Sequence, residues 1–166
     1  MYKFRIFQKV CQTRKGVLMQ SIKIEPIGII HSPFKNIEDI PGQGYHRENI
    51  EAVIEIDEKY KPAMKDIEGF SHLIVLFYFH KSTKTHMRGH PSWEGKEHGV
   101  FALRSPHRPN HIGMTVIKVK QVCDNEIVFT NVDMLDETPV IDIKPYMGEF
   151  ERINNPKFGW LEKHKG

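Results

Sequence analysis

Short runs of β-branched and aromatic residues recur along this chain of 166 residues, and most of its prolines and glycines lie between them. Such runs predict β-strands, whereas proline and glycine favour the turns that join strands. The runs span residues 22–31, 51–56, 72–80, 100–104, 112–122, 126–133 and 138–143. Only residues 58–67, with Pro62 in the first turn and Gly69 beyond the end, predict a helix. The pattern therefore indicates a mainly β fold with few short helices, built as an antiparallel sheet or barrel.

Two of these runs also predict how their strands are covered. Residues 51–56 alternate, with Ala52, Ile54 and Ile56 on one face and carboxylates on the other, which is typical of a half-buried strand. Residues 72–80 are apolar on both faces, which predicts a central strand covered on both sides.

The common nucleotide-binding and acyl-transfer motifs do not occur in this sequence. Strands do not alternate with helices, and no Gly-x-Gly-x-x-Gly follows a strand, so the sequence argues against a Rossmann fold. It contains neither a P-loop nor a Gly-x-Ser-x-Gly elbow. The two cysteines, Cys11 and Cys123, lie far apart and have no metal-binding spacing, which favours a reducing, cytoplasmic setting.

Charge and hydropathy favour a soluble single domain. The mildly basic charge is compatible with a polyanionic partner but does not require one. The formal charge is +3, and the longest apolar run, residues 73–79, is shorter than the roughly 20 residues that span a bilayer. Residues 1–21 are basic and contain no acidic residue. They are either an arm that contacts phosphates or an appendage preceding a true start at Met19. We expect an extension over residues 1–21, a barrel domain over 22–147 and a tail over 148–166.

The stretch from Phe101 to Met114, FALRSPHRPNHIGM, is the strongest candidate for a binding loop. Its prolines stiffen the backbone and exclude a helix, and rigidly supported loops often carry function. Arg104 and Arg108 lie four residues apart in it, so both can face one ligand and bind a carboxylate or phosphate. The alternative is that the two guanidinium groups bond to carbonyls and carboxylates of the protein itself.

A second stretch, DMLDETPVIDIKPY over residues 133–146, combines carboxylates, a prolyl turn and an aromatic residue. Asp133 and Asp136 lie three apart, so the paired carboxylates either bind a metal or orient polar ligand hydrogens; the alternative is that Asp136 caps a turn through its own backbone. Tyr146 follows a proline, so its ring either stacks on a flat ligand or belongs to the core.

Several histidines precede the binding loop and raise the question of a metal. They are His80, His86, His90 and His98. Imidazole is a good ligand for transition metals, but the spacing is not His-Glu-x-x-His and no cysteine joins them. We therefore predict a histidine-rich solvated loop and no metal site, with a His-dependent metalloenzyme as the weaker alternative.

Four sequence blocks, taken in order, resemble the TsaA-like (TrmO) family of S-adenosylmethionine-dependent tRNA methyltransferases. They are IGIIHSPFK (27–35), GFSHLIVLFYFHK (69–81), RSPHRPNHIGM (104–114) and DMLDETPVIDIKPY (133–146). The resemblance covers roughly residues 24–146. It implies a small β-barrel that acts as a homodimer. It also implies methylation of the exocyclic amine of threonylcarbamoyladenosine at position 37 of tRNA, in the anticodon loop.

The resemblance also implies which residues form the site. Those expected to bind S-adenosylmethionine are Pro41, Gly42, Gln43, His80, Lys81, Arg104, Met114, Asp133, Leu135, Asp136, Glu137 and Thr138. Those expected near the target base, as catalytic residues, are Asp142, Lys144 and Tyr146. Basic residues expected to hold tRNA phosphates are Lys81, Arg88 and Arg108.

Two positions depart from the family pattern. The usual proline after Asn110 is His111, and the usual glycine after Asp136 is Glu137. Glycine tolerates left-handed backbone dihedrals that glutamate resists, so Glu137 is expected to affect the cofactor turn or substrate preference. The alternative function is a non-catalytic barrel that binds RNA or a nucleotide.

Overall fold

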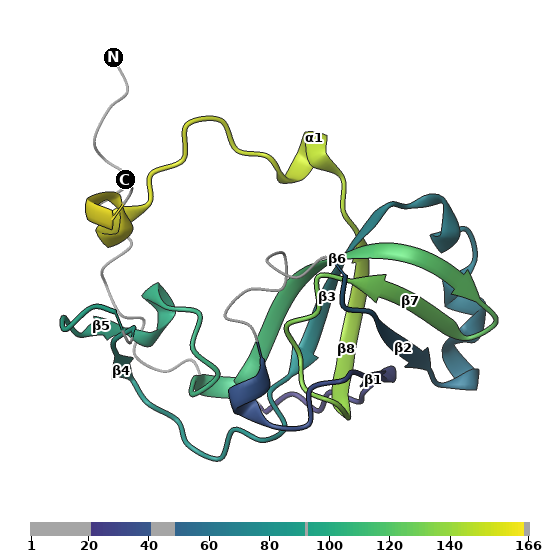
Figure 1. The fold of residues 1–166 in the computed structure, drawn as a ribbon, viewed down its shortest axis with the longest axis horizontal. Coiled ribbons are helices and arrows are strands. Elements are labelled where there is room, and N and C mark those ends of the chain that lie inside the picture. Colours follow the sequence, from purple (N-terminus) through teal and green to yellow (C-terminus); the bar gives the residue numbers. More distant parts are fainter. Residues whose placement is uncertain (1–20, 41–48, 92, 165–166) are drawn as a thin grey trace.

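The computed structural model describes residues 21–40, 49–91 and 93–164, and its centre is a closed six-stranded barrel (Figure 1). Every neighbouring pair of strands is antiparallel, in the order β1-β2-β7-β6-β3-β8. The strands are β1 (Gly28–His31), β2 (Ala52–Ile56), β3 (His72–Tyr78), β6 (Ile112–Cys123), β7 (Glu126–Thr130) and β8 (Thr138–Pro145). The predicted fold class, a mainly β antiparallel barrel, is confirmed.

Alternate residues of these strands fill the barrel. Ala52, Ile54 and Ile56 of β2 are buried as their alternation predicts, and Glu55 between them is exposed. The largest fully buried apolar side chains are Ile30, Ile54, Leu73, Val75, Ile117, Ile127, Phe129, Val132, Met134 and Val140. Burial of these side chains supplies the main stabilisation of the fold.

The outer face of β3 differs from the prediction. Leu73, Val75 and Phe77 point into the barrel and are buried, but Ile74 and Leu76 are only half-buried. Nothing in the described part of the chain covers this outer face completely. The prediction of a strand covered on both sides is therefore right for the face inside the barrel, but the outer face is only partly covered in a single copy of this chain.

The ends of several strands also differ from the predicted ranges. β1 begins at Gly28 instead of residue 22, since Pro26 has no N–H for a strand ladder. β7 ends at Thr130, and Asn131 beyond it adopts a positive φ of 66°. The hairpin turn between β6 and β7 is confirmed, with Asp124 at a φ of 56°.

Short 3₁₀ turns replace two predicted elements. The predicted helix over residues 58–67 is a pair of 3₁₀ helices, η4 (Glu58–Met64) and η5 (Ile67–Gly69), interrupted by Asp66 at a φ of 66°. The predicted strand over 100–104 is wrong: η6 (Val100–Ala102) is a 3₁₀ turn closed by the Leu103 N–H on the Val100 carbonyl. The remaining turns are η2 (Ile37–Asp39), η7 (Pro109–His111) and η8 (Gly159–His164).

Two segments extend from the barrel. We name residues 79–111 the excursion; it joins β3 to β6 and contains a separate pair of strands, β4 (Arg88–Gly89) and β5 (His98–Gly99). We name residues 148–164 the strap; it begins with α1 (Gly148–Glu151), leaves the barrel in a wide arc and returns beside β4 and β5 (Figure 1). Within the described ranges, no helix has the length and hydropathy needed to cross a membrane.

Candidate functional site

A cavity of about 640 Å³ lies where the excursion meets the barrel. Its apolar wall comes from barrel strands, from the segment at η2 that follows β1, from the excursion and from the 134–135 connection. Its members include Ile37, Ile40, Phe77, Phe79, Phe101, Leu103, Ile112, Met134 and Leu135. Polar side chains from the same segments enter it, and they are His80, Lys81, Ser82, Arg104, His107, Arg108, Asp133 and Thr138. A mostly apolar cavity with a few convergent polar groups is the usual form of a small-molecule site.

The excursion brings both predicted arginines to this cavity. Arg108 also donates from Nη1 to the Leu103 carbonyl, at 3.0 Å, so one of its donors fixes the loop itself. Arg104 is exposed and makes no hydrogen bond or ion pair within the described ranges, which leaves its guanidinium available to an anionic ligand. Arg108 therefore has the structural contact of the second alternative, whereas Arg104 is available to a ligand, as the first alternative requires.

Gly113 lets the cavity wall form beside the first strand residues of β6. It pairs with Phe77, and a Cβ built at position 113 would lie 2.4 Å from two ring carbons of Phe77. Only glycine fits this close approach without a shift of the ring. Met114, the next residue, is 53% exposed and lines the cavity edge.

His80 follows β3 and presents an unusual imidazole to the cavity. Its Nδ1 lies 3.4 Å from the Thr138 hydroxyl, and its buried Nε2 has no hydrogen-bond partner in the described part of the chain. Burial, assisted by the positive charge of Lys81, lowers the pKa of His80. The imidazole is therefore neutral at neutral pH, and Nε2 is left to a polar atom of a bound ligand.

The connection from β7 to β8 supplies the other side of the cavity. Asp133 accepts a hydrogen bond at Oδ2 from the Thr115 hydroxyl, at 3.1 Å. Asp133, Leu135 and Thr138, which the family resemblance assigns to the cofactor, all line the cavity.

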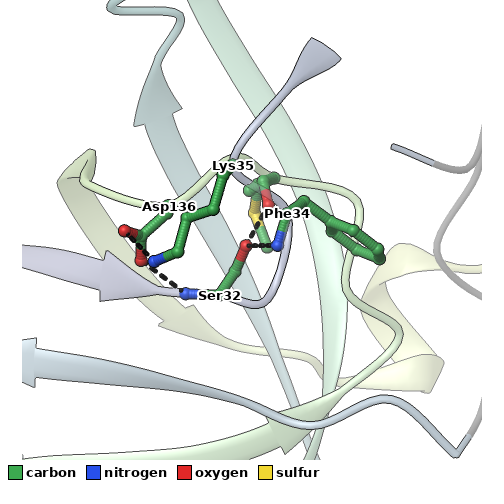
Figure 2. A network of polar contacts seen from close by, with 5 residues as sticks. Ser32, Phe34, Lys35 and Asp136 are labelled. Atoms are coloured by element: carbon green, nitrogen blue, oxygen red, sulfur yellow. Dashed lines mark hydrogen bonds and ion pairs between the residues drawn. The ribbon is translucent and has the colours of Figure 1, made fainter. Parts of the chain in front are cut away.

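Asp136, in contrast, holds this connection to β1 instead of lining the cavity (Figure 2). One carboxylate oxygen accepts the Ser32 N–H at 3.0 Å, and the other is paired with Lys35. The Lys35 hydrogen bond, with the Ser32 amide assisting, lowers the pKa of Asp136. Within the described ranges, the carboxylate therefore bonds to the segment that follows β1 and not, as the capping alternative predicts, to the backbone of its own turn.

Ser32 completes this network and was not singled out from the sequence. Its hydroxyl donates to the Met134 carbonyl at 2.8 Å and accepts the Phe34 N–H at 3.1 Å, and Ser32 is 6% exposed (Figure 2). These contacts join residues 102 positions apart and fix Met134, a wall residue of the cavity. The only sequence signal for Ser32 was its place in the block IGIIHSPFK.

Glu137 and His111, the two positions that depart from the family pattern, both have a left-handed backbone conformation. Glu137 has a φ of 61° and His111 a φ of 49°, both in the left-handed region. Glycine would adopt the dihedrals of position 137 more readily, while proline is excluded from those of position 111. Glu137 is exposed and lies beside the cavity residue Thr138 without lining the cavity.

The three residues expected near the target base lie on the outer surface of β8 and beyond it, outside the cavity lining. Asp142 is paired with Lys144 at 2.7 Å, and Tyr146 meets the ring of His72 edge-on with centroids 6.3 Å apart. Asp142 and Met114 are both register partners of Leu76. Two strand spacings, about 10 Å, therefore separate Asp142 from the cavity edge at Met114.

The remaining predicted residues fall into three groups. Lys81 and Arg108 line the cavity, whereas Arg88 lies on the β4–β5 pair, 3.7 Å from Glu97. The predicted cofactor residues Pro41, Gly42 and Gln43 lie outside the described residues. Among residues that are described, no group of three or more His, Cys, Asp or Glu side chains is arranged to hold a metal ion.

Together these observations define a class: a closed antiparallel barrel whose small-molecule cavity is built by loops at one end. The sequence model of the tRNA-methyltransferase O N-terminal domain matches residues 29–152. The chain therefore belongs to the tRNA-methyltransferase O (TrmO) family, as the four sequence blocks predicted.

Individual relatives agree with this membership. A probable S-adenosyl-L-methionine-binding protein of Pyrococcus abyssi is 43% identical over 148 residues, which cover 89% of this chain and 80% of that protein. A tRNA (adenine(37)-N6)-methyltransferase of Mus musculus is 36% identical over 138 residues, 79% of this chain and 32% of that protein. The crystal structure of TrmO from Pseudomonas aeruginosa superposes with a TM-score of 0.73 at 31% identity. The match covers 84% of this chain and 62% of that one, so this chain corresponds to less than two thirds of TrmO.

Proposed function

We propose that this protein is an S-adenosylmethionine-dependent tRNA methyltransferase that modifies the exocyclic nitrogen of an adenine at position 37. The observation that carries the proposal is that one cavity gathers most of the described residues that the family resemblance assigns to the cofactor. These residues are His80, Lys81, Arg104, Met114, Asp133, Leu135 and Thr138.

The cavity fits S-adenosylmethionine in size and chemistry. Its volume of about 640 Å³ lies within the range of roughly 300–1,000 Å³ that small-molecule sites occupy. Arg104 has a free guanidinium for the methionine carboxylate. The partnerless Nε2 of His80 and the carboxylate of Asp133 suit amino and hydroxyl groups, and the apolar wall suits the adenine and thioether parts.

The cofactor supplies, when bound, an electrophilic methyl group on a sulfonium sulfur. Transfer would join this methyl carbon to the adenine nitrogen as the carbon–sulfur bond breaks, and the proton released by the nitrogen would pass to the Asp142 carboxylate or to water. Because the leaving thioether is neutral, the protein has to orient the two reactants more than it has to stabilise a charge. Arg104, His80 and Asp133 hold one reactant, and the loops around the cavity exclude water.

Asp142, Lys144 and Tyr146 act on the target base in this proposal, and a second copy of the chain brings them to it. The outer face of β3 and β6 leaves Met114 53% and Val116 36% exposed, next to the half-buried Leu76. Apolar side chains of a central strand favour a partner on this face. Met114 also borders the cavity. In a homodimer formed through this face, the outer surface of β8 from one copy therefore lies beside the interface and near the cavity edge of the other copy.

The tRNA is held by phosphate contacts at the cavity mouth. Lys81 and Arg108 come from the excursion, and Arg88 extends the positive surface along β4. Binding of this kind weakens steeply with salt. We further propose that the substrate is the threonylcarbamoyl form of adenosine in the anticodon loop, and that the protein works in the cytoplasm.

The proposal is tested by methyl transfer to defined tRNAs. The purified full chain is incubated with methyl-labelled S-adenosylmethionine and with a tRNA that carries threonylcarbamoyladenosine at position 37, or with the same tRNA without that modification. Nucleoside mass spectrometry then locates the label. We expect one methyl group on the modified adenosine and none on the unmodified control. Cofactor and RNA binding without transfer would refute the enzyme and favour a binding module.

The roles on β8 need a separate comparison. Asp142→Asn should lower transfer at least tenfold while leaving cofactor affinity unchanged, and Glu126→Gln, an exposed carboxylate on β7, serves as the control. Sedimentation of wild type and of Met114→Lys, which places a charge on the apolar face, tests the homodimer. Equal transfer by Asp142→Asn would remove that residue from the mechanism.

A further inference from the structure

The last turn of the strap is fastened to the excursion by an aromatic and hydrogen-bonded contact. The indole of Trp160 stacks on the imidazole of His98, with ring centroids 4.2 Å apart and planes inclined by 20°. Its Nε1 donates to the carbonyl of Ala102 at 3.0 Å, across 58 positions of sequence. Trp93, also in the excursion, stacks on the same indole with ring centroids 5.8 Å apart. The side chain of Trp160 thus makes three contacts with the excursion, two by stacking and one by a hydrogen bond.

A carboxylate held between two imidazoles reinforces this attachment. Glu94 lies between His98 and His164, with oxygen–nitrogen distances of 3.1 Å and 3.4 Å. Burial disfavours the charge of Glu94, but the hydrogen bonds from the two histidines outweigh it and lower the pKa of the carboxyl. The side chains of Glu94 and His98 are only 16% and 12% exposed, so solvent weakens the pairing little.

The point of attachment is the segment that supplies one wall of the cavity. Phe101, Leu103 and Arg104 line the cavity on either side of Ala102. This segment is a single 3₁₀ turn outside any strand ladder, and Phe101 is 80% exposed. Its other polar anchors in the described part of the chain are the Val100 N–H on the Met87 carbonyl and the Arg108 guanidinium on the Leu103 carbonyl, each at 3.0 Å. A bond to the Ala102 carbonyl therefore restricts the position of Arg104 two residues later.

The matched family domain ends at residue 152, so the turn that carries Trp160 lies beyond it. We propose that Trp160 is a positioning residue: it fixes the wall that bears Arg104 and so sets the affinity of the cavity for its cofactor. This role rests on the proposed function, because it assumes that S-adenosylmethionine occupies the cavity. Trp160 itself does not line the cavity and acts through the Ala102 carbonyl.

The test compares three single variants in the full chain. Trp160→Ala removes both the stacking and the hydrogen bond, Trp160→Phe keeps an aromatic ring but removes the donor, and Leu161→Ala changes a neighbouring side chain of the same turn. Two quantities are measured: the dissociation constant for S-adenosylmethionine by calorimetry, and amide hydrogen exchange of residues 100–104 in the absence of cofactor.

We expect the dissociation constant to rise about tenfold in Trp160→Ala and about threefold in Trp160→Phe, as losing one or both contacts implies. Leu161→Ala should stay within about twofold of wild type. Exchange at residues 100–104 should accelerate in the same order, while the β3 and β6 amides remain protected. Graded loss with partial rescue by phenylalanine separates positioning from general destabilisation.

Three results would overturn the proposal, and they are distinguishable. Wild type that binds no S-adenosylmethionine would refute the proposed function, and with it the role of Trp160. Wild type that binds normally, together with Trp160→Ala of equal affinity or unchanged exchange at 100–104, would refute only the role of Trp160. Accelerated exchange throughout the barrel would also refute it, since the effect would then be global unfolding.

Discussion

Replacing Ser32 by alanine removes the hydroxyl that joins the β1 end to the cavity wall. The hydroxyl makes two hydrogen bonds, to the Met134 carbonyl at 2.8 Å and from the Phe34 N–H at 3.1 Å, and Ser32 is 6% exposed. Each such bond contributes about 1 kcal/mol, and the buried backbone partners left without one add to the loss, so Ser32→Ala should cost about 2–3 kcal/mol of unfolding free energy. The Ser32 N–H bond to Asp136 is a backbone contact and should persist.

Equilibrium urea unfolding of wild type and variant measures this cost. The midpoint should fall with an unchanged slope, and the melting temperature should drop by about 4–12 °C for a chain of this size. Ser71→Ala is the matched control. Ser71 is exposed, its hydroxyl lies 2.9 Å from Nδ1 of the half-buried His72 ring and has no other hydrogen bond within the described ranges, and its loss should cost about 0.5 kcal/mol or less. Equal midpoints for the two variants would refute the reasoning that the Ser32 hydroxyl holds the connection.

Three further changes test other parts of the account by urea unfolding. Because the pKa of Asp136 is lower in the folded than in the unfolded protein, the ionised carboxylate stabilises the fold above its ordinary pKa of about 4, and this stabilisation is lost as pH falls through the folded pKa. The difference in unfolding free energy between wild type and Asp136→Asn should therefore shrink on acidification. A difference that stays constant with pH would contradict the pairing with Lys35. Glu137→Gly should raise the free energy of unfolding by about 1 kcal/mol, because φ at position 137 is 61° and glycine adopts this value more readily than glutamate. A lower free energy of unfolding would show that the glutamate side chain stabilises the fold. Gly113→Ala should cost about 1–3 kcal/mol because its Cβ would lie 2.4 Å from the Phe77 ring, and a neutral result would mean that the ring moves freely.

Local pattern was enough to predict a mainly β antiparallel fold, and the family resemblance predicted that its strands form a barrel. The alternation of Ala52, Ile54 and Ile56, and the turn at Asp124, depend on neighbours within a few residues, so sequence alone reveals them. The segment 100–104 was predicted wrongly because its apolar residues serve a cavity wall and not a strand ladder. Periodicity cannot distinguish these two uses of a short apolar run.

The site was predictable only where the binding groups lie in compact motifs. Arg104 and Arg108 share a proline-rich loop, and both line the cavity. The contact of Ser32 with Met134 spans 102 positions, and that of Trp160 with Ala102 spans 58. No local rule of sequence links residues so far apart, since barrel closure and the path of the strap bring them together.

The central claim, that this cavity holds S-adenosylmethionine through Arg104, is tested most directly by calorimetric titration of the purified protein with that cofactor. Wild type should bind it saturably, and Arg104→Ala should weaken binding at least tenfold by removing the partner of the cofactor carboxylate. Arg88→Ala, which removes an exposed arginine outside the cavity, should bind like wild type. Absence of binding by a folded wild type, or equal affinity of wild type and Arg104→Ala, would contradict the account.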